Sequence, residues 1–128
     1  MESYTVVELA TVLGVTDAAL RQKIRSHELP FSYKAGKISI AATDFENYLQ
    51  ANRCWDFEIP EWSVYRQVRR PIKQQFTKIQ GALQVLAEYG ISIEQRTLKR
   101  WIQSRQVKAF NLGGTYYIPI DVLRTDLA

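Results

Sequence analysis

The sequence has little cysteine and histidine and no long apolar run, and each shortage excludes a class of protein or site. The single cysteine, Cys54, excludes an internal disulfide and is compatible with a reducing cytoplasm. We expect it to be a buried or half-buried apolar residue and not a reactive thiol. The single histidine, His27, lies far from Cys54 in sequence, so no zinc site is expected. No apolar run approaches the length of a membrane span and no charged-then-apolar leader is visible, which predicts a soluble, cytoplasmic protein without membrane contact.

Catalytic patterns are missing as well. No histidine is placed to activate a serine or cysteine nucleophile. The glycine pair Gly113-Gly114 is typical of a hairpin turn with positive φ and not of a phosphate-cradling loop. We therefore expect no enzymatic activity, no metal and no cofactor.

One stretch of the sequence occurs twice. Apolar or glycine positions recur at a constant offset of 78 residues, namely Leu20 and Leu98, Ile24 and Ile102, Leu29 and Val107, Gly36 and Gly114, and Ile40 and Ile118. An offset held over so many positions predicts an internal duplication. The 128 residues have room for two units of about 50 residues, each small enough to need help from its neighbour. We predict units at 1–50 and 76–128, joined by an ordered connector at 51–75.

The first copy predicts two helices, then a hairpin, then a closing helix. A helix at 5–13 opens with the Thr-x-x-Glu spacing of a capping box and ends before a glycine. A basic helix follows at about 16–26, and then a β-hairpin at 31–39. A closing helix is expected from Thr43, which has Glu46 at capping-box spacing.

The second copy predicts the same order with a longer start. Its first helix begins either at Pro71, a favoured first helical residue, or at Thr77, which has capping-box spacing. A more basic helix is expected at about 95–104, a hairpin at 111–118 and a short closing helix at 121–127. The turn between the first two helices has two further residues compared with the first copy.

Helix, tight turn, basic helix and hairpin together make a winged helix-turn-helix, so the expected fold class is mainly α with small β-hairpin wings. The second copy contains Thr97-Leu98-Lys99-Arg100-Trp101-Ile102, then Leu112-Gly113-Gly114-Thr115-Tyr116-Tyr117-Ile118, then Asp121-Val122-Leu123. This pattern resembles the excisionase-type helix-turn-helix domain, which is related to the DNA-binding domain of the mercury-resistance (MerR) regulators. The resemblance implies a tandem winged helix-turn-helix that binds double-stranded DNA. The first copy departs from the pattern at Ala35 and Lys23, which replace a wing glycine and a tryptophan.

Charge is unevenly distributed along the chain. Residues 1–50 carry a net charge of −1, residues 51–76 of +2 and residues 77–128 of +3. If neutralisation of phosphates drives binding, the second copy and the connector contribute more than the first. A pI near 9.3 supports a nucleic-acid partner.

The basic helix and the wing of the first copy hold its candidate DNA contacts: Thr16, Asp17, Ala18, Arg21, Gln22, Arg25, Lys34 and Lys37. Arg21 and Gln22 are the side chains best suited to base edges, and the two lysines to phosphates or the minor groove. The alternative is a solvated amphipathic face.

The second copy offers a larger set: Gln95, Arg96, Thr97, Lys99, Arg100, Gln103, Arg105 and Lys108. Trp101 is expected to pack under the wing. This wing has no lysine or arginine, so it is a weaker candidate for groove insertion than the first.

The connector combines aromatic and basic residues. Trp55, Phe57 and Ile59 alternate with acidic residues, which predicts a short extended segment that packs the units together or forms a subunit contact. A basic run follows: Arg66, Arg69, Arg70 and Lys73. This run either follows the DNA backbone between the units or is an ordinary solvated face.

The resemblance implies an excisionase-like architectural factor of a mobile element. Such a protein would bend DNA, bias a site-specific recombinase and associate with itself along the DNA, as part of the nucleoid. A small transcriptional regulator that contacts RNA polymerase and senses no ligand is the alternative. A protein-interaction adaptor that has lost DNA binding is a third hypothesis, which the acidic first unit keeps open.

Overall fold

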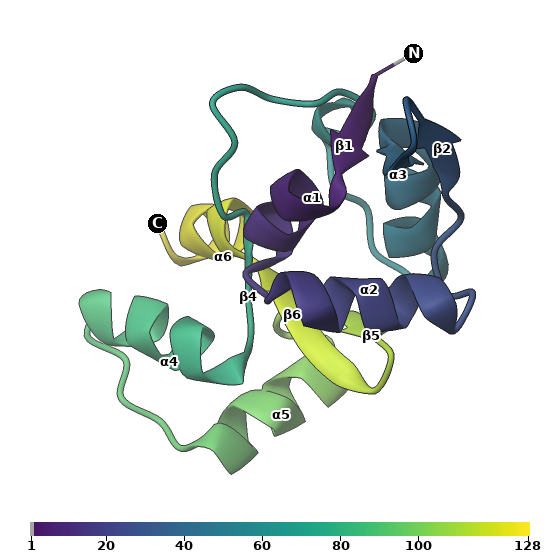
Figure 1. Ribbon diagram of the computed structural model, residues 1–128. Helices are drawn as coiled ribbons and strands as arrows, with labels where there is room; N and C mark the ends of the chain where they lie inside the picture. Colours follow the sequence, from purple (N-terminus) through teal and green to yellow (C-terminus); the bar gives the residue numbers. More distant parts are fainter. Residues whose placement is uncertain (1) are drawn as a thin grey trace. The chain divides into compact units, whose positions relative to one another are not determined.

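The computed structural model describes residues 2–128, and the chain divides into two units (Figure 1). Unit 1 takes the chain up to Ala51 and again from Ile59 to Gln74. Unit 2 takes residues 52–58 and 75–128. The stretch expected as a connector, 51–75, is thus shared between the units. No helix in the described part of the chain is long and apolar enough to cross a membrane.

Unit 1 combines helices with a small antiparallel sheet. Its elements are β1 (Ser3–Thr5), α1 (Val6–Leu13), α2 (Asp17–Arg25), β2 (Ser32–Lys34), β3 (Lys37–Ala41), α3 (Ala42–Ala51) and the 3-10 helix η1 (Trp62–Tyr65). The strand order is β1-β3-β2, and Tyr4 lies opposite Ile40. Strand β1 has no signal in the sequence, because three residues that pair only with a distant strand leave no local pattern.

Local signals in the sequence place α1 and α2. Thr5 Oγ1 accepts from the backbone N–H of Glu8 at 3.2 Å, and Glu8 Oε1 accepts from the backbone N–H of Thr5 at 3.0 Å. The predicted capping box is confirmed. Gly14 ends α1 with a left-handed φ of 73°, and Thr16 caps α2 by accepting from the N–H of Ala19 at 3.1 Å.

The core of unit 1 fixes which face of α2 points outward. The fully buried side chains of this unit include Tyr4, Leu9, Leu13, Leu20, Ile40, Phe45 and Leu49. The ring of Tyr4 meets that of Phe45 edge to face, with centroids 5.8 Å apart. Because Leu20 and Ile24 of α2 are buried, its polar side chains occupy the opposite, exposed face.

Unit 2 has the same order of elements. They are β4 (Phe76–Thr77), α4 (Ile79–Glu88), α5 (Gln95–Gln103), β5 (Phe110–Leu112), β6 (Thr115–Pro119) and α6 (Ile120–Leu127). The strand order β4-β6-β5 matches β1-β3-β2. Its core is a buried apolar cluster that includes Ala82, Leu86, Leu98, Ile102 and Ile118.

The bounds of the elements repeat with the offset seen in the sequence. Helix α5, strand β5 and strand β6 begin and end 78 residues after α2, β2 and β3. Positive φ values recur at the same offset, at His27 (60°) and Arg105 (69°) after the basic helices, and at Ala35 (53°) and Gly113 (66°) in the hairpins. The turn before α5 has six residues, 89–94, compared with the three, 14–16, before α2.

The expectation of a helix from Pro71 is wrong. Helix α4 begins at Ile79, after Lys78 at the N-cap position, which makes no side-chain capping bond. Thr77 does not cap the helix either, since Lys78 stands at the N-cap position; Thr77 is the last residue of β4, lies opposite Ile118 and is buried.

Two further expectations are corrected. Helix α3 begins at Ala42, whose N–H donates to the carbonyl of Glu2 at 3.1 Å, so Thr43 lies inside the helix and does not cap it. Residues 55–59 form no strand. Phe57 instead packs on Phe110 of unit 2, with ring centroids 5.6 Å apart.

Candidate nucleic-acid interface

Helix α2 exposes the side chains that the sequence indicated for its outer face, Asp17, Ala18, Arg21, Gln22 and Arg25, with Thr16 exposed at its N-cap. Asp17 lies in the first turn, where the helix dipole favours a carboxylate. Lys23 is turned away and lies 3.9 Å from Glu28. The exposed set therefore carries two arginines and one aspartate.

Helix α5 exposes a more strongly basic face. Its exposed side chains line an open hollow along the helix: Gln95, Arg96, Lys99, Arg100 and Gln103. None of these is acidic, and the opposite face is anchored by the fully buried Leu98 and Ile102. Thr97 is half-buried, and Trp101 packs against the core cluster of unit 2.

The two hairpins differ in charge although their geometry is similar. In unit 1, Lys34 and Lys37 lie opposite each other across the turn and both are exposed. In unit 2 the equivalent pair is Leu112 and Thr115. Only the wing of unit 1 presents cations to a phosphate.

Three of the predicted cations have carboxylate partners. Arg66 binds Glu46 through Nε, at 2.9 Å from Oε1 and 2.6 Å from Oε2. Arg70 pairs with Glu8, and Lys108 lies 3.6 Å from Asp126. Glu46 is buried, so Arg66 neutralises a charge that would otherwise be costly. Each of these ion pairs lies within a single unit.

The remaining predicted cations take part in no ion pair within the described residues 2–128. They are exposed and comprise Arg21, Arg25, Lys34, Lys37, Arg69, Lys73, Arg96, Lys99, Arg100 and Arg105. Unpaired cations on one molecule attract an anionic partner most strongly, because no internal carboxylate competes for them.

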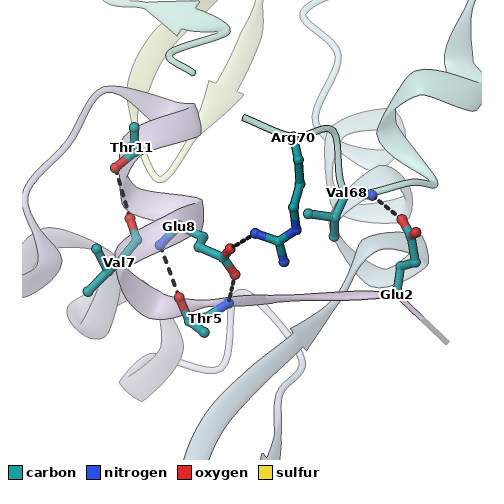
Figure 2. A network of polar contacts seen from close by, with 7 residues as sticks. All are labelled: Glu2, Thr5, Val7, Glu8, Thr11, Val68 and Arg70. Atoms are coloured by element: carbon teal, nitrogen blue, oxygen red, sulfur yellow. Dashed lines mark hydrogen bonds and ion pairs between the residues drawn. The ribbon is translucent and has the colours of Figure 1, made fainter. Parts of the chain in front are cut away.

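A polar network ties the basic run to the start of unit 1, as Figure 2 shows. Arg70 reaches Glu8 of the α1 capping box, and the backbone N–H of Val68 donates to Glu2. Burial alone would raise the pKa of Glu8. Hydrogen bonds from the backbone of Thr5 and from Arg70 outweigh that effect, and the pKa is lowered. The basic run is thus an ordered part of unit 1.

Two exposed apolar side chains near the cations of unit 1 were not among the predicted DNA contacts. Tyr33 of β2 is 70% exposed and Val7 of α1 is 59% exposed. They line an open hollow in unit 1 together with Arg21 and Lys37. The sequence gives no signal for them, because apolar residues in a strand and in an amphipathic helix are expected to face a core.

The structure offers little for metal or thiol chemistry. No group of three or more His, Cys, Asp and Glu side chains that could hold a metal occurs among residues 2–128. Burial raises the pKa of the Cys54 thiol to about 11, so it stays protonated near neutral pH.

Comparison with known proteins agrees with the geometry of unit 1. Residues 3–53 match the model of a family described as a helix-turn-helix domain, over the stretch from β1 through α3. No curated protein and no solved structure was found to match. The match supports a DNA-binding helix-turn-helix domain in unit 1.

Proposed function

We propose that the chain is a tandem winged helix-turn-helix protein that binds a bipartite site on double-stranded DNA. The observation that carries this proposal is the face of α5. It presents Arg96, Lys99 and Arg100 without a carboxylate partner among residues 2–128, on a helix whose other side is locked into a core. Such a face provides both phosphate contacts and side chains for base edges.

The common topology of the two units supports the tandem arrangement. Helix α5 has the same bounds relative to its hairpin as α2, which lies within the helix-turn-helix match. Because one chain carries both units, the second binding event is intramolecular, and two weak contacts give a tight complex. The domain boundaries that follow from this proposal are 1–50 and 76–128, with 51–75 serving both units.

Within this class, we favour an excisionase-like architectural factor that bends DNA for a site-specific recombinase. This preference rests on the resemblance of the second copy to the excisionase-type domain. Protomers that associate along the DNA would extend the bend. The protein acts by binding and not by catalysis, and it works on DNA in the nucleoid. A small transcriptional regulator that contacts RNA polymerase would use the same surface.

Selection from a random duplex library, repeated at two salt concentrations, tests the proposal. We expect one enriched motif with two half-sites, and an affinity that falls steeply as salt rises. The selected site, placed at different positions within a longer fragment, then reports bending as a position-dependent gel mobility. Strong bending supports the architectural role, and a straight complex favours the regulator. Absence of any enriched motif contradicts the proposal and favours a protein-interaction adaptor.

A further inference from the structure

The hollow in unit 1 lies between the start of α1, the helix α2 and the wing. Its lining includes Thr5 and Val7 of the β1–α1 segment, Arg21 of α2, and Tyr33, Gly36 and Lys37 of the hairpin. It is open to solvent and has a volume of about 620 Å³, in the size range of sites that take small organic molecules. We call it the helix–wing hollow.

The helix–wing hollow is cationic and carries no acidic side chain. Arg21 and Lys37 take part in no ion pair within the described residues, and none of the lining residues is a carboxylate. Glu8, which follows Val7 in α1, is held by the backbone of Thr5 and by Arg70. Charge complementarity therefore selects an anionic occupant.

The helix–wing hollow also has an apolar part with one aromatic side chain supported by another. The ring of Tyr33 meets that of Phe31 edge to face, with centroids 5.7 Å apart, and is still 70% exposed. A supported ring loses little conformational entropy when it binds. With Val7 nearby in the lining, the hollow combines two cations with two apolar surfaces.

Unit 2 shows that the fold does not demand this combination. At the positions equivalent to Tyr33 and Lys37, it has Asn111 and Thr115. Asn111 Oδ1 accepts from the N–H of Gly114 at 2.9 Å, so that side chain supports its own turn. The same topology therefore carries a charged, aromatic hollow in one unit and a neutral, polar wing in the other.

We infer that the helix–wing hollow binds the sugar-phosphate backbone of one DNA strand. Arg21 and Lys37 contact the phosphate, and Tyr33 and Val7 pack against the deoxyribose. This inference rests on the proposed function and adds a division of roles to it. Unit 1 holds the backbone between helix and wing, whereas unit 2 binds through the face of α5.

The experiment combines affinity with hydroxyl-radical footprinting, which reports the exposure of each deoxyribose, on the selected duplex. We expect Tyr33→Ala to weaken binding about tenfold, equivalent to about 1.4 kcal/mol, and to expose one cluster of sugars. Tyr33→Phe keeps the ring and should bind like the wild type. Lys37→Ala should lower the slope of log affinity against log salt by about 1, and its matched control in unit 2, Thr115→Ala, should not change it.

Arg100→Ala separates failure of this inference from failure of the proposed function. If Arg100→Ala weakens binding while Tyr33→Ala and Lys37→Ala leave both affinity and footprint unchanged, the helix–wing hollow does not hold DNA. If none of the three substitutions alters DNA binding, the proposed function itself is contradicted. Circular dichroism of each variant checks that the exposed substitutions leave the fold intact.

Discussion

At the scale of single residues, the structure explains a glycine in the middle of a helix. A Cβ at Gly81 of α4 would lie 1.7 Å from Oγ1 of Thr77 and 3.0 Å from its Cβ. Thr77 is buried in β4, and its short β-branched side chain is stiff about χ1. The close approach of strand to helix therefore requires glycine.

We predict that Gly81→Ala destabilises the protein, although alanine is the better helix former. The loss in the free energy of unfolding should be about 1–3 kcal/mol, as for other overpacked sites, and urea denaturation measures it. The double variant Gly81→Ala with Thr77→Ala removes the clashing hydroxyl and should recover part of that loss. Equal stability of Gly81→Ala and wild type would contradict the close contact.

The roles of some residues could be predicted from the sequence, and the roles of others could not. The caps Thr5 and Thr16 were predictable because each bonds within its own first turn. The partner of Glu46 was not predictable, because Arg66 lies twenty residues away. Contacts across such distances depend on the tertiary fold, which no local spacing encodes.

At the scale of elements, the cap of α1 is linked to the basic run. Glu8 belongs to the capping box and also pairs with Arg70, and its pKa is lowered. A carboxyl whose pKa falls on folding stabilises the folded state above its unfolded pKa, and that stabilisation is lost as the pH falls through the folded pKa. The stability of unit 1 should therefore decline on acidification, below the ordinary range for glutamate.

We predict that Arg70→Ala removes part of this acid-sensitive stability. The variant should be less stable by about 0.5–1 kcal/mol at about pH 7, because Arg70 is exposed and its pair is screened by solvent. The difference from wild type should shrink as the pH falls through the lowered pKa of Glu8 and vanish once Glu8 is protonated in both proteins. Thermal unfolding over this pH range measures it, and in a Glu8→Gln background the difference should be absent at every pH. A difference that stays constant with pH would contradict the role of Glu8.

Some helices and strands could be predicted from the sequence, and others could not. The basic helices and hairpins were predicted within one or two residues, because periodic apolar positions and turn residues define them locally. The strands β1 and β4 were not predicted, since each has at most three residues and exists only through pairing with a distant hairpin strand. Both predicted starts of α4 were wrong, because the helix begins at Ile79 after Lys78, an N-cap residue that makes no side-chain capping bond.

At the scale of the whole molecule, the two units differ in the charge of their exposed basic helices. The exposed set on α2 includes Asp17 beside two arginines, whereas the set on α5 has three cations and no acid. The division of residues 52–74 between the units was not predictable from composition. The aromatic side chains of this stretch pack inside one unit or the other; Trp62, for example, packs against Tyr65, and both belong to unit 1. Composition does not indicate to which unit each aromatic residue belongs.

The most direct test of the tandem proposal measures the affinity of two variants for the selected DNA site and for two altered versions of that site. Affinities of wild type, Gln22→Ala and Arg100→Ala, which each remove a side chain suited to base edges, are measured on the selected site and on sites with one or the other half scrambled. We expect each variant to lose about 1–3 kcal/mol on the full site. Each loss should disappear when the half-site read by its own unit is scrambled and persist when the other half is scrambled. If both variants lose the same affinity on all three sites, the two units do not read separate half-sites, and the tandem account is contradicted.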